Sequence, residues 1–448
     1  MTNSGTVLPI NPNILLGDVR ETLKSLPDKS IHCVVTSPPY WGLRDYGTAT
    51  WLGGDPSCSH KRDSKFSESC STGQRNLEGA IGDGIYKTSC PRCGAIRIDS
   101  QLGLEQTKEQ YVENMVSVFS EVWRVLRDDG TLWLNLGDSY AGSNGNGYKQ
   151  SIASTNASNA GGENEDFRAI IGRDDGELKP KDLVGIPWRV ALALQSAGWY
   201  LRQDIIWNKP NPMPESVLDR CTKAHEYIFL LTKKPRYFYD SEAIKEPAKY
   251  AGDDRGSRSD SRRGTEMNSM SGSTGSMKNK RSVWTVTTKP FKEAHFATFP
   301  QDLIEPCIKA GTSEHGCCSI CQAPYVRVVE RKRIARNELP KDDVNYRPNN
   351  YEGAYAEING KGDAGFSHTE TKGWEKSCKC VGEEVIPCTV LDVFFGAGTT
   401  GVVAQKLGRN YLGCELNPEY AEIASVRLAN ELKKIEEAKA VEQLKLFS

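Results

Sequence analysis

Long hydrophobic runs are absent from this sequence. No apolar stretch in the chain approaches the roughly 20 residues that a membrane-spanning helix needs. The first residues, MTNSGTVLPINPN, lack a basic segment followed by an apolar one, so they do not read as a secretory signal. We therefore expect a cytoplasmic protein with no membrane partner.

An excess of charge of either sign is also absent. The 57 Lys and Arg residues are balanced by 58 Asp and Glu residues, which leaves a formal net charge of -1. A protein held to nucleic acid by its overall charge would be basic, so any DNA contact must come from local patches. The 448 residues suffice for one large α/β domain with insertions or for two to three ordinary domains.

Segments with helical and strand-like patterns alternate along much of the chain. Residues 111–126 carry apolar side chains at helical spacing, and the apolar segment GTLWLNL follows them through a polar DDG turn. Residues 389–408 read as strand, glycine turn and helix, and residues 418–446 as one long amphipathic helix. This rhythm predicts an α/β fold with a mainly parallel sheet.

The glycine turn near the end of the chain has the features of a ligand site. Gly396 and Gly398 follow an apolar strand and precede a helix, where glycines allow close backbone approach and the helix start offers free N–H groups. Glu415 ends the next predicted strand, as does the acidic residue that binds ribose hydroxyls in nucleotide-binding βαβ units. No P-loop lysine follows, which favours an adenosine ligand without phosphates. A tight structural turn is the alternative.

A stiff loop follows the apolar segment HCVV. Its residues Ser37, Pro38, Pro39 and Tyr40 come just past a predicted strand, where open α/β sheets bind ligands. Ser37 and the Pro38 carbonyl are placed to accept the two hydrogens of an exocyclic amino group while its base stacks on Tyr40. Those contacts would turn the nitrogen lone pair toward an electrophilic methyl group, so catalysis would come from orientation and polarisation. An ordinary Pro-Pro turn with a packed tyrosine is the alternative.

Four segments in this order resemble the β group of DNA amino-methyltransferases, whose catalytic loop precedes the cofactor-binding glycine turn. TSPPYWGLRDYG resembles the catalytic motif of that family, and DVFFGAGTTG resembles its glycine turn. HFATFPQDLIEPCIKAG resembles the segment that cradles the methionine end of the cofactor. GDVRETLKSLPDKSI resembles the element whose aspartate, here Asp18, binds the adenine. The resemblance implies a Rossmann-like fold with circularly permuted motif order, S-adenosylmethionine as cofactor, and double-stranded DNA with a flipped base as substrate.

The resemblance also assigns roles to single residues. The implied catalytic residues are Ser37, Pro38, Pro39 and Tyr40. The implied cofactor-binding residues are Asp18, Phe299, Pro300, Asp392, Phe394, Gly396, Gly398, Thr399, Thr400 and Glu415.

The target base and the partners are less constrained. In this family an SPPY loop usually accompanies N4 of cytosine and a (D/N)PPY loop N6 of adenine, so Ser37 favours cytosine and leaves adenine as the alternative. RNA or a protein glutamine as substrate, and a non-catalytic DNA-binding module, are more distant alternatives. The sequence leaves open whether a cognate restriction endonuclease exists, and what the oligomeric state is.

The fourteen cysteines include two sets with the spacing of metal ligands. The first set is Cys58, His60, Cys90 and Cys93, and the second is Cys318, Cys321, Cys378 and Cys380. Each fills all four positions of a tetrahedral site, which predicts structural zinc that stabilises an insertion poor in apolar residues. Cys317 leaves the register of the second set ambiguous, and Cys70 is a candidate substitute ligand. Free cysteines in loops are the alternative.

These features predict a division of the chain. The catalytic half comprises residues 1–51 and 101–248, the first insertion 52–100, the target-recognition region about 210–290, the cofactor-binding half 291–313 and 385–448, and the second insertion 314–384. Within the target-recognition region, residues 249–282 form a flexible basic loop suited to phosphate contacts. Its basic residues include Arg255, Arg258, Arg262, Arg263, Lys278, Lys280 and Arg281.

Overall fold

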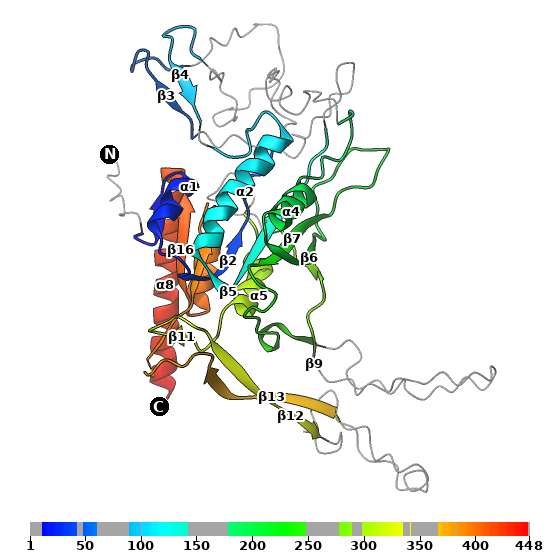
Figure 1. The fold of residues 1–448 in the computed structure, drawn as a ribbon, viewed down its shortest axis with the longest axis vertical. Helices are drawn as coiled ribbons and strands as arrows, with labels where there is room; N and C mark the ends of the chain where they lie inside the picture. Colours follow the sequence, from blue (N-terminus) through cyan, green and yellow to red (C-terminus); the bar gives the residue numbers. More distant parts are fainter. Residues whose placement is uncertain are drawn as a thin grey trace, which may run out of the picture. The chain divides into compact units, whose positions relative to one another are not determined.

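The computed structural model (Figure 1) describes residues 11–42, 48–60, 89–99, 101–141, 178–247, 277–288, 298–334, 341, 366–382 and 384–446. The chain divides into two compact units. The first comprises Met1–Tyr237, Val283–Ile308 and Thr389–Ser448, and the second Phe238–Ser282 and Lys309–Cys388.

An eight-stranded sheet forms the centre of the first unit, in the order β1-β16-β15-β2-β5-β7-β6-β10. The strands are β1 (Ile14–Leu16), β2 (Ile31–Thr36), β5 (Leu126–Leu136), β6 (Tyr200–Asn208), β7 (His225–Thr232), β10 (Val283–Thr285), β15 (Thr389–Asp392) and β16 (Asn410–Glu415). All neighbouring strands are parallel except that β7 runs antiparallel to both β5 and β6. The mainly parallel sheet that the sequence predicts is confirmed.

Helices cover this sheet. They are α1 (Val19–Thr22), the 3-10 turn η1 (Leu23–Ser25), α2 (Lys108–Val125), α4 (Ile186–Ser196), α5 (Gln301–Gly311), α7 (Thr399–Lys406) and α8 (Pro418–Leu446). Helix α2 begins where the Thr107 side chain accepts a hydrogen bond from the Gln110 amide, and its apolar stripe, including Met115 and Phe119, is fully buried. Helices α2 and α4 pack against each other, as do α7 and α8. Helix α8 spans the residues predicted for it, and no helix in the described part of the chain is long and apolar enough to cross a membrane.

The expected DDG turn between α2 and the next strand is wrong. Strand β5 begins at Leu126, directly after the helix. Leu126 pairs with Ile31 and Thr131 with Cys33, so residues 127–130 bulge opposite the single residue His32. Gly130 permits this bulge, because a Cβ atom there would lie 2.9 Å from the His32 carbonyl oxygen.

Strand polarity brings several loops to one edge of the sheet, which we call the carboxyl edge. The parallel strands β1, β16, β15, β2, β5 and β6 all end there, and β7 begins there because it is antiparallel. Strand β2 is buried along its whole length between β15 and β5, as its apolar composition requires. The loops after β2 and β15 therefore leave neighbouring strands at the same edge.

Small strand pairs make up the rest of the described structure. In the first unit β3 (Thr50–Leu52) pairs with β4 (Ile96–Ile98). The second unit contains the 3-10 turn η4 (Glu242–Ile244) and the antiparallel pairs β8 (Glu246–Pro247) with β9 (Met277–Lys278), β11 (Cys317–Cys318) with β14 (Val385–Ile386), and β12 (Tyr325–Ile334) with β13 (Phe366–Lys376). Four arginines of the predicted basic loop, Arg255, Arg258, Arg262 and Arg263, lie outside the described residues, and so does Cys70.

Candidate active site at the carboxyl edge of the sheet

The TSPPY loop, residues Thr36–Tyr40, leaves the end of β2 in a conformation fixed by hydrogen bonds. The Tyr111 hydroxyl of α2 donates to the Pro39 carbonyl at 2.9 Å. The Ser37 hydroxyl lies 3.3 Å from Oδ1 of Asn135, which lies on the neighbouring strand β5. The Asn135 amide nitrogen donates to the Tyr227 carbonyl at 3.0 Å, so its oxygen faces the loop as an acceptor. The Ser37 proton can therefore point to Asn135, which leaves the lone pairs of Ser37 for another donor.

Tyr40 is held by a charged pair that the sequence reading did not identify. Its hydroxyl donates to Oε2 of Glu226 at 2.8 Å, and the other carboxylate oxygen of Glu226 accepts from Lys209. Burial, followed by the charge of Glu226, raises the pKa of Tyr40 well above its ordinary value, so the phenol stays protonated. The ring lies against the backbone of Gly137, where a Cβ atom would approach its Cε2 to 2.5 Å.

The sequence does contain a signal for this pair. Lys209 directly follows β6 and Glu226 is the second residue of β7, so both are charged residues near the end of a strand. Their meeting depends on β6 and β7 being antiparallel neighbours, which the sequence does not show.

The glycine turn, residues 393–398, leaves the end of β15 beside the TSPPY loop. Gly396 and Gly398 have φ values of 50° and 74°, a region that favours glycine. The Gly396 amide donates to Oε2 of Glu415 at 2.7 Å, and the Asn417 amide donates to Oε1 at 2.8 Å. Burial raises the pKa of Glu415. A Cβ atom on Gly396 would meet nothing within 4 Å, so the turn is open on that side.

Asp392 joins the two motifs. Its Oδ1 accepts from the Thr36 hydroxyl at 2.6 Å, and its Oδ2 accepts from the Thr400 hydroxyl at 2.7 Å. Thr36 begins the TSPPY loop and Thr400 lies in the first turn of α7. Burial raises the pKa of Asp392 to about 7, although the two hydroxyl donors oppose that shift. One buried carboxyl group thus ties the loop after β2 to the helix after the glycine turn.

Comparison with known proteins identifies the family. The sequence family described as DNA methylase matches residues 31–318 and 388–426, which include both motifs. The chain belongs to this DNA methylase family. The resemblance to amino-methyltransferases that the sequence indicated is confirmed.

Relatives of this methylase match it over most of their length. The chain is 37% identical to the Type II methyltransferase M.Cfr9I of Citrobacter freundii over 93% of this chain and 87% of that protein. It is 35% identical to the Type II methyltransferase M.SmaI of Serratia marcescens over 93% of this chain and 90% of that protein. The solved PvuII DNA methyltransferase (cytosine-N4-specific) aligns over 94% of this chain and 91% of its own at 14% identity and a TM-score of 0.43, which is too low to support a conclusion.

The other predicted cofactor residues of the methylase differ in their surroundings. Asp18 caps α1 through the Arg20 amide and forms an ion pair with Arg20 at 2.6 Å, which lowers the pKa of Asp18. It follows β1, whose Leu16 pairs with Glu415, so Asp18 and Glu415 share the carboxyl edge. The Thr399 hydroxyl accepts from Arg427 at 2.9 Å.

Three further residues of the methylase occupy places in or near the core. Phe394 packs against the main hydrophobic cluster of the first unit. Phe299 is half-buried and Pro300 is buried immediately before α5. Their roles toward a cofactor stay predictions.

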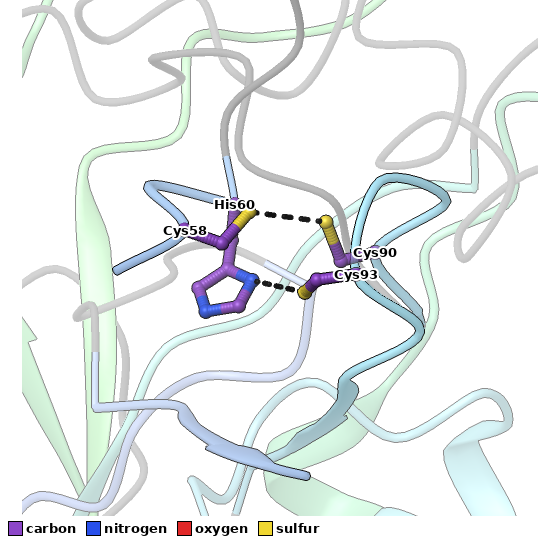
Figure 2. Close-up of side chains that lie close together, drawn as sticks. All are labelled: Cys58, His60, Cys90 and Cys93. Atoms are coloured by element: carbon purple, nitrogen blue, oxygen red, sulfur yellow. Dashed lines mark hydrogen bonds between the residues drawn. The ribbon is translucent and has the colours of Figure 1, made fainter. Parts of the chain in front are cut away.

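Both predicted metal sets of the methylase come together. In the first, shown in Figure 2, the Cys58 and Cys90 sulfurs lie 3.8 Å apart and the Cys93 sulfur lies 3.5 Å from Nδ1 of His60. The candidate ligand atoms within each set all lie within 4.8 Å of one another. The second set consists of Cys318, Cys321, Cys378 and Cys380, and therefore uses Cys318 rather than Cys317.

The two sets share one backbone motif, which we call the knuckle. In the first, the Gly94 amide donates to the Cys90 carbonyl and the Cys90 amide to the Ala95 carbonyl, both at 2.8 Å. In the second, the Gln322 amide donates to the Cys318 carbonyl at 2.8 Å and the Cys318 amide to the Ala323 carbonyl at 3.0 Å. The residue after the second cysteine has positive φ in both, 74° at Gly94 and 58° at Gln322. Two segments of this chain thus present cysteine pairs in the same way.

Proposed function

We propose that this methylase transfers the methyl group of S-adenosylmethionine to N4 of a cytosine flipped out of double-stranded DNA. The observation that carries the proposal is the bridge through Asp392, which holds the TSPPY loop and the glycine turn side by side. The TSPPY loop, which is proposed to accept the amino hydrogens, is therefore adjacent to the glycine turn, which is open to a ligand. In the chain the TSPPY strand β2 precedes the glycine-turn strand β15, which is the permuted order of the β group.

The residues present fit the cofactor. A Cβ atom on Gly396 would meet nothing within 4 Å, and the buried Glu415 carboxylate lies on the turn, where the Gly396 and Asn417 amides hold it. Glu415 is the residue proposed to hold the ribose hydroxyls, with Asp18 at the same edge for the adenine. When bound, S-adenosylmethionine supplies an electrophilic methyl group.

The TSPPY loop would bind and polarise the amino group. Ser37 and the Pro38 carbonyl accept its two hydrogens, and the Tyr40 ring stacks on the base. The Glu226 carboxylate holds the Tyr40 hydroxyl, so the ring presents one fixed face. That arrangement would leave the amino nitrogen lone pair free to attack the methyl group in line. The nitrogen–carbon bond would form as the sulfur–carbon bond of the cofactor breaks, and the amino group would then lose one proton, without a covalent intermediate with the protein.

Cytosine is proposed as the base because the loop begins with Ser37 rather than Asp or Asn. Adenine N6 is the alternative within the family. Because the relatives are Type II methyltransferases, we propose that the protein acts in a restriction–modification system beside a cognate endonuclease.

The target-recognition region is proposed to lie at residues 210–290. Of its basic loop, Lys278, Lys280 and Arg281 are described, and Lys278 and Arg281 pair with Glu246, at 3.3 and 2.8 Å. DNA phosphates would have to replace that carboxylate as their partner.

The two Cys/His sets are proposed to bind structural zinc. Protein atoms fill all four positions in each set, which leaves no open position for a substrate or an activated water. Zinc would therefore stabilise the insertions and take no part in methyl transfer itself.

Methyl transfer from radiolabelled S-adenosylmethionine tests the proposed function. Purified wild-type protein should label plasmid DNA and leave RNA and added protein unlabelled. Ser37→Ala should bind the cofactor as the wild type does and lower kcat by about 100-fold, since one polarising contact is lost. Label in RNA or protein and none in DNA would contradict the proposed substrate.

A further inference from the structure

We infer that Cys58, His60, Cys90 and Cys93 form a zinc centre that anchors the TSPPY loop, so that metal binding in the first insertion sets the catalytic rate. The inference rests on the proposed function for its kinetic part. The metal site itself rests on the ligand geometry alone.

The four side chains are arranged as a closed zinc site. Three thiol groups and one imidazole are the ligand types zinc prefers, and all four lie within 4.8 Å of one another. The His60 ring stacks on Trp51 with 4.1 Å between centroids. Its Nδ1 lies 3.5 Å from the Cys93 sulfur (Figure 2). His60 also has a φ of 51°, a conformation that costs free energy and that metal binding would hold.

The hairpin beside this site cannot be stable by itself. Strands β3 and β4 have only 3 residues each, and a lone two-stranded hairpin is at best marginally stable. Its apolar side chains do not form a core, because Leu52 is 62% exposed, Ile96 56% and Ile98 44%. Cys58 follows β3 and Cys93 precedes β4, so a zinc ion would join the two strands at one end.

Hydrogen bonds join the strands at the other end. The Thr48 hydroxyl donates to Oδ1 of Asp99 at 3.3 Å, and the same oxygen accepts from the Gln101 amide at 3.0 Å. Arg97 of β4 pairs with Asp99 at 2.9 Å. Asp99 therefore connects the hairpin to the segment that leads back to α2.

That segment lies directly against the TSPPY loop. The Gly42 amide donates to the Gly103 carbonyl at 2.8 Å, and the Trp41 indole donates to the Glu105 carbonyl at 3.0 Å. A Cβ atom on Gly103 would come within 3.1 Å of the Tyr40 carbonyl oxygen. The described contacts thus run from the Cys/His set through β3–β4 and Asp99 to the backbone of Tyr40.

Variants of Cys58 and His60 test whether loss of the metal lowers kcat while the fold is retained. We would measure zinc per chain by atomic emission, the S-adenosylmethionine Kd by calorimetry, and kcat on plasmid DNA. The double variant Cys58→Ser/His60→Ala should lose one zinc per chain, keep the cofactor Kd within about threefold, and lower kcat by about 100-fold, as displacement of a catalytic group by about 1 Å would. The matched control His60→Cys keeps four ligands, so it should retain the zinc and have a kcat closer to the wild type than that of the double variant.

The other outcomes overturn the inference. Equal zinc in the wild type and the double variant would show that these residues hold no metal. Loss of zinc with unchanged kcat would remove the anchoring role, and loss of cofactor binding would show general unfolding in place of a local effect. A wild type that binds zinc but methylates no DNA would overturn the proposed function and leave the metal site standing.

Discussion

At the scale of single residues, Asp392 makes a prediction about pH. Burial raises the pKa of this carboxyl group from 3.8 to about 7 in the folded protein. Between those values the folded state binds more protons than the unfolded state, so this group's contribution to stability falls as pH rises through the range. Asp392→Asn should weaken the fall in the free energy of unfolding between pH 4 and pH 7, measured by denaturant titration. An unchanged pH profile in the variant would contradict the assignment to Asp392. Burial also raises the pKa of Glu415, but this effect is present in both proteins and does not contribute to their difference.

Tyr40 and Glu226 should behave as a coupled pair. The hydrogen bond between them holds the ring, so either Tyr40→Phe or Glu226→Gln breaks the same contact. We expect each single variant to lower kcat about tenfold and the double variant to be little worse, a coupling on the order of 1 kcal/mol. A double-mutant cycle on kcat at saturating DNA measures this. Additive effects would show that the two residues act separately.

At the scale of elements, the shared knuckle predicts that removing a glycine from one set and introducing a glycine into the other have opposite effects on the rate of zinc release. Gly94 and Gln322 occupy the same position with positive φ, which costs a residue with a Cβ atom roughly 1–2 kcal/mol. Gly94→Ala should therefore speed release of zinc from the first set, and Gln322→Gly should slow its release from the second. Competition with a chromogenic chelator measures both rates. A change of the same sign in both variants would contradict the common knuckle.

The elements that the sequence predicts best have strong local signals. Residues 389–415 show an apolar strand, two glycines, an apolar helix and a second strand, and the structure places β15, α7 and β16 there. The DDG segment was misread because Asp-Gly normally indicates a turn. Leu126 before this segment pairs with Ile31 of β2, and Thr131 after it pairs with both β2 and β7, so the segment is a bulge within a strand that continues on both sides. Tertiary contacts override the local preference.

At the scale of the whole molecule, strand order decides what the sequence can reveal about the site. The two sets of candidate metal ligands were predictable because each consists of two pairs of residues that are close in sequence. The places of the TSPPY loop and the glycine turn at strand ends were predictable, because the apolar segments before them are strong local signals for strands. Their junction through Thr36, Asp392 and Thr400 was not, since it requires β2 and β15 to be neighbours. The Lys209–Glu226 pair needed the antiparallel β7 as well.

The central claim is methylation of an exocyclic amino group in DNA, with cytosine N4 as the target. The most direct measurement is mass spectrometry of nucleosides from plasmid DNA treated with the purified protein and S-adenosylmethionine. We predict N4-methylcytosine. N6-methyladenine would keep the enzyme class and contradict the assignment based on Ser37. Absence of both from DNA, with cofactor binding intact, would contradict the account as a whole.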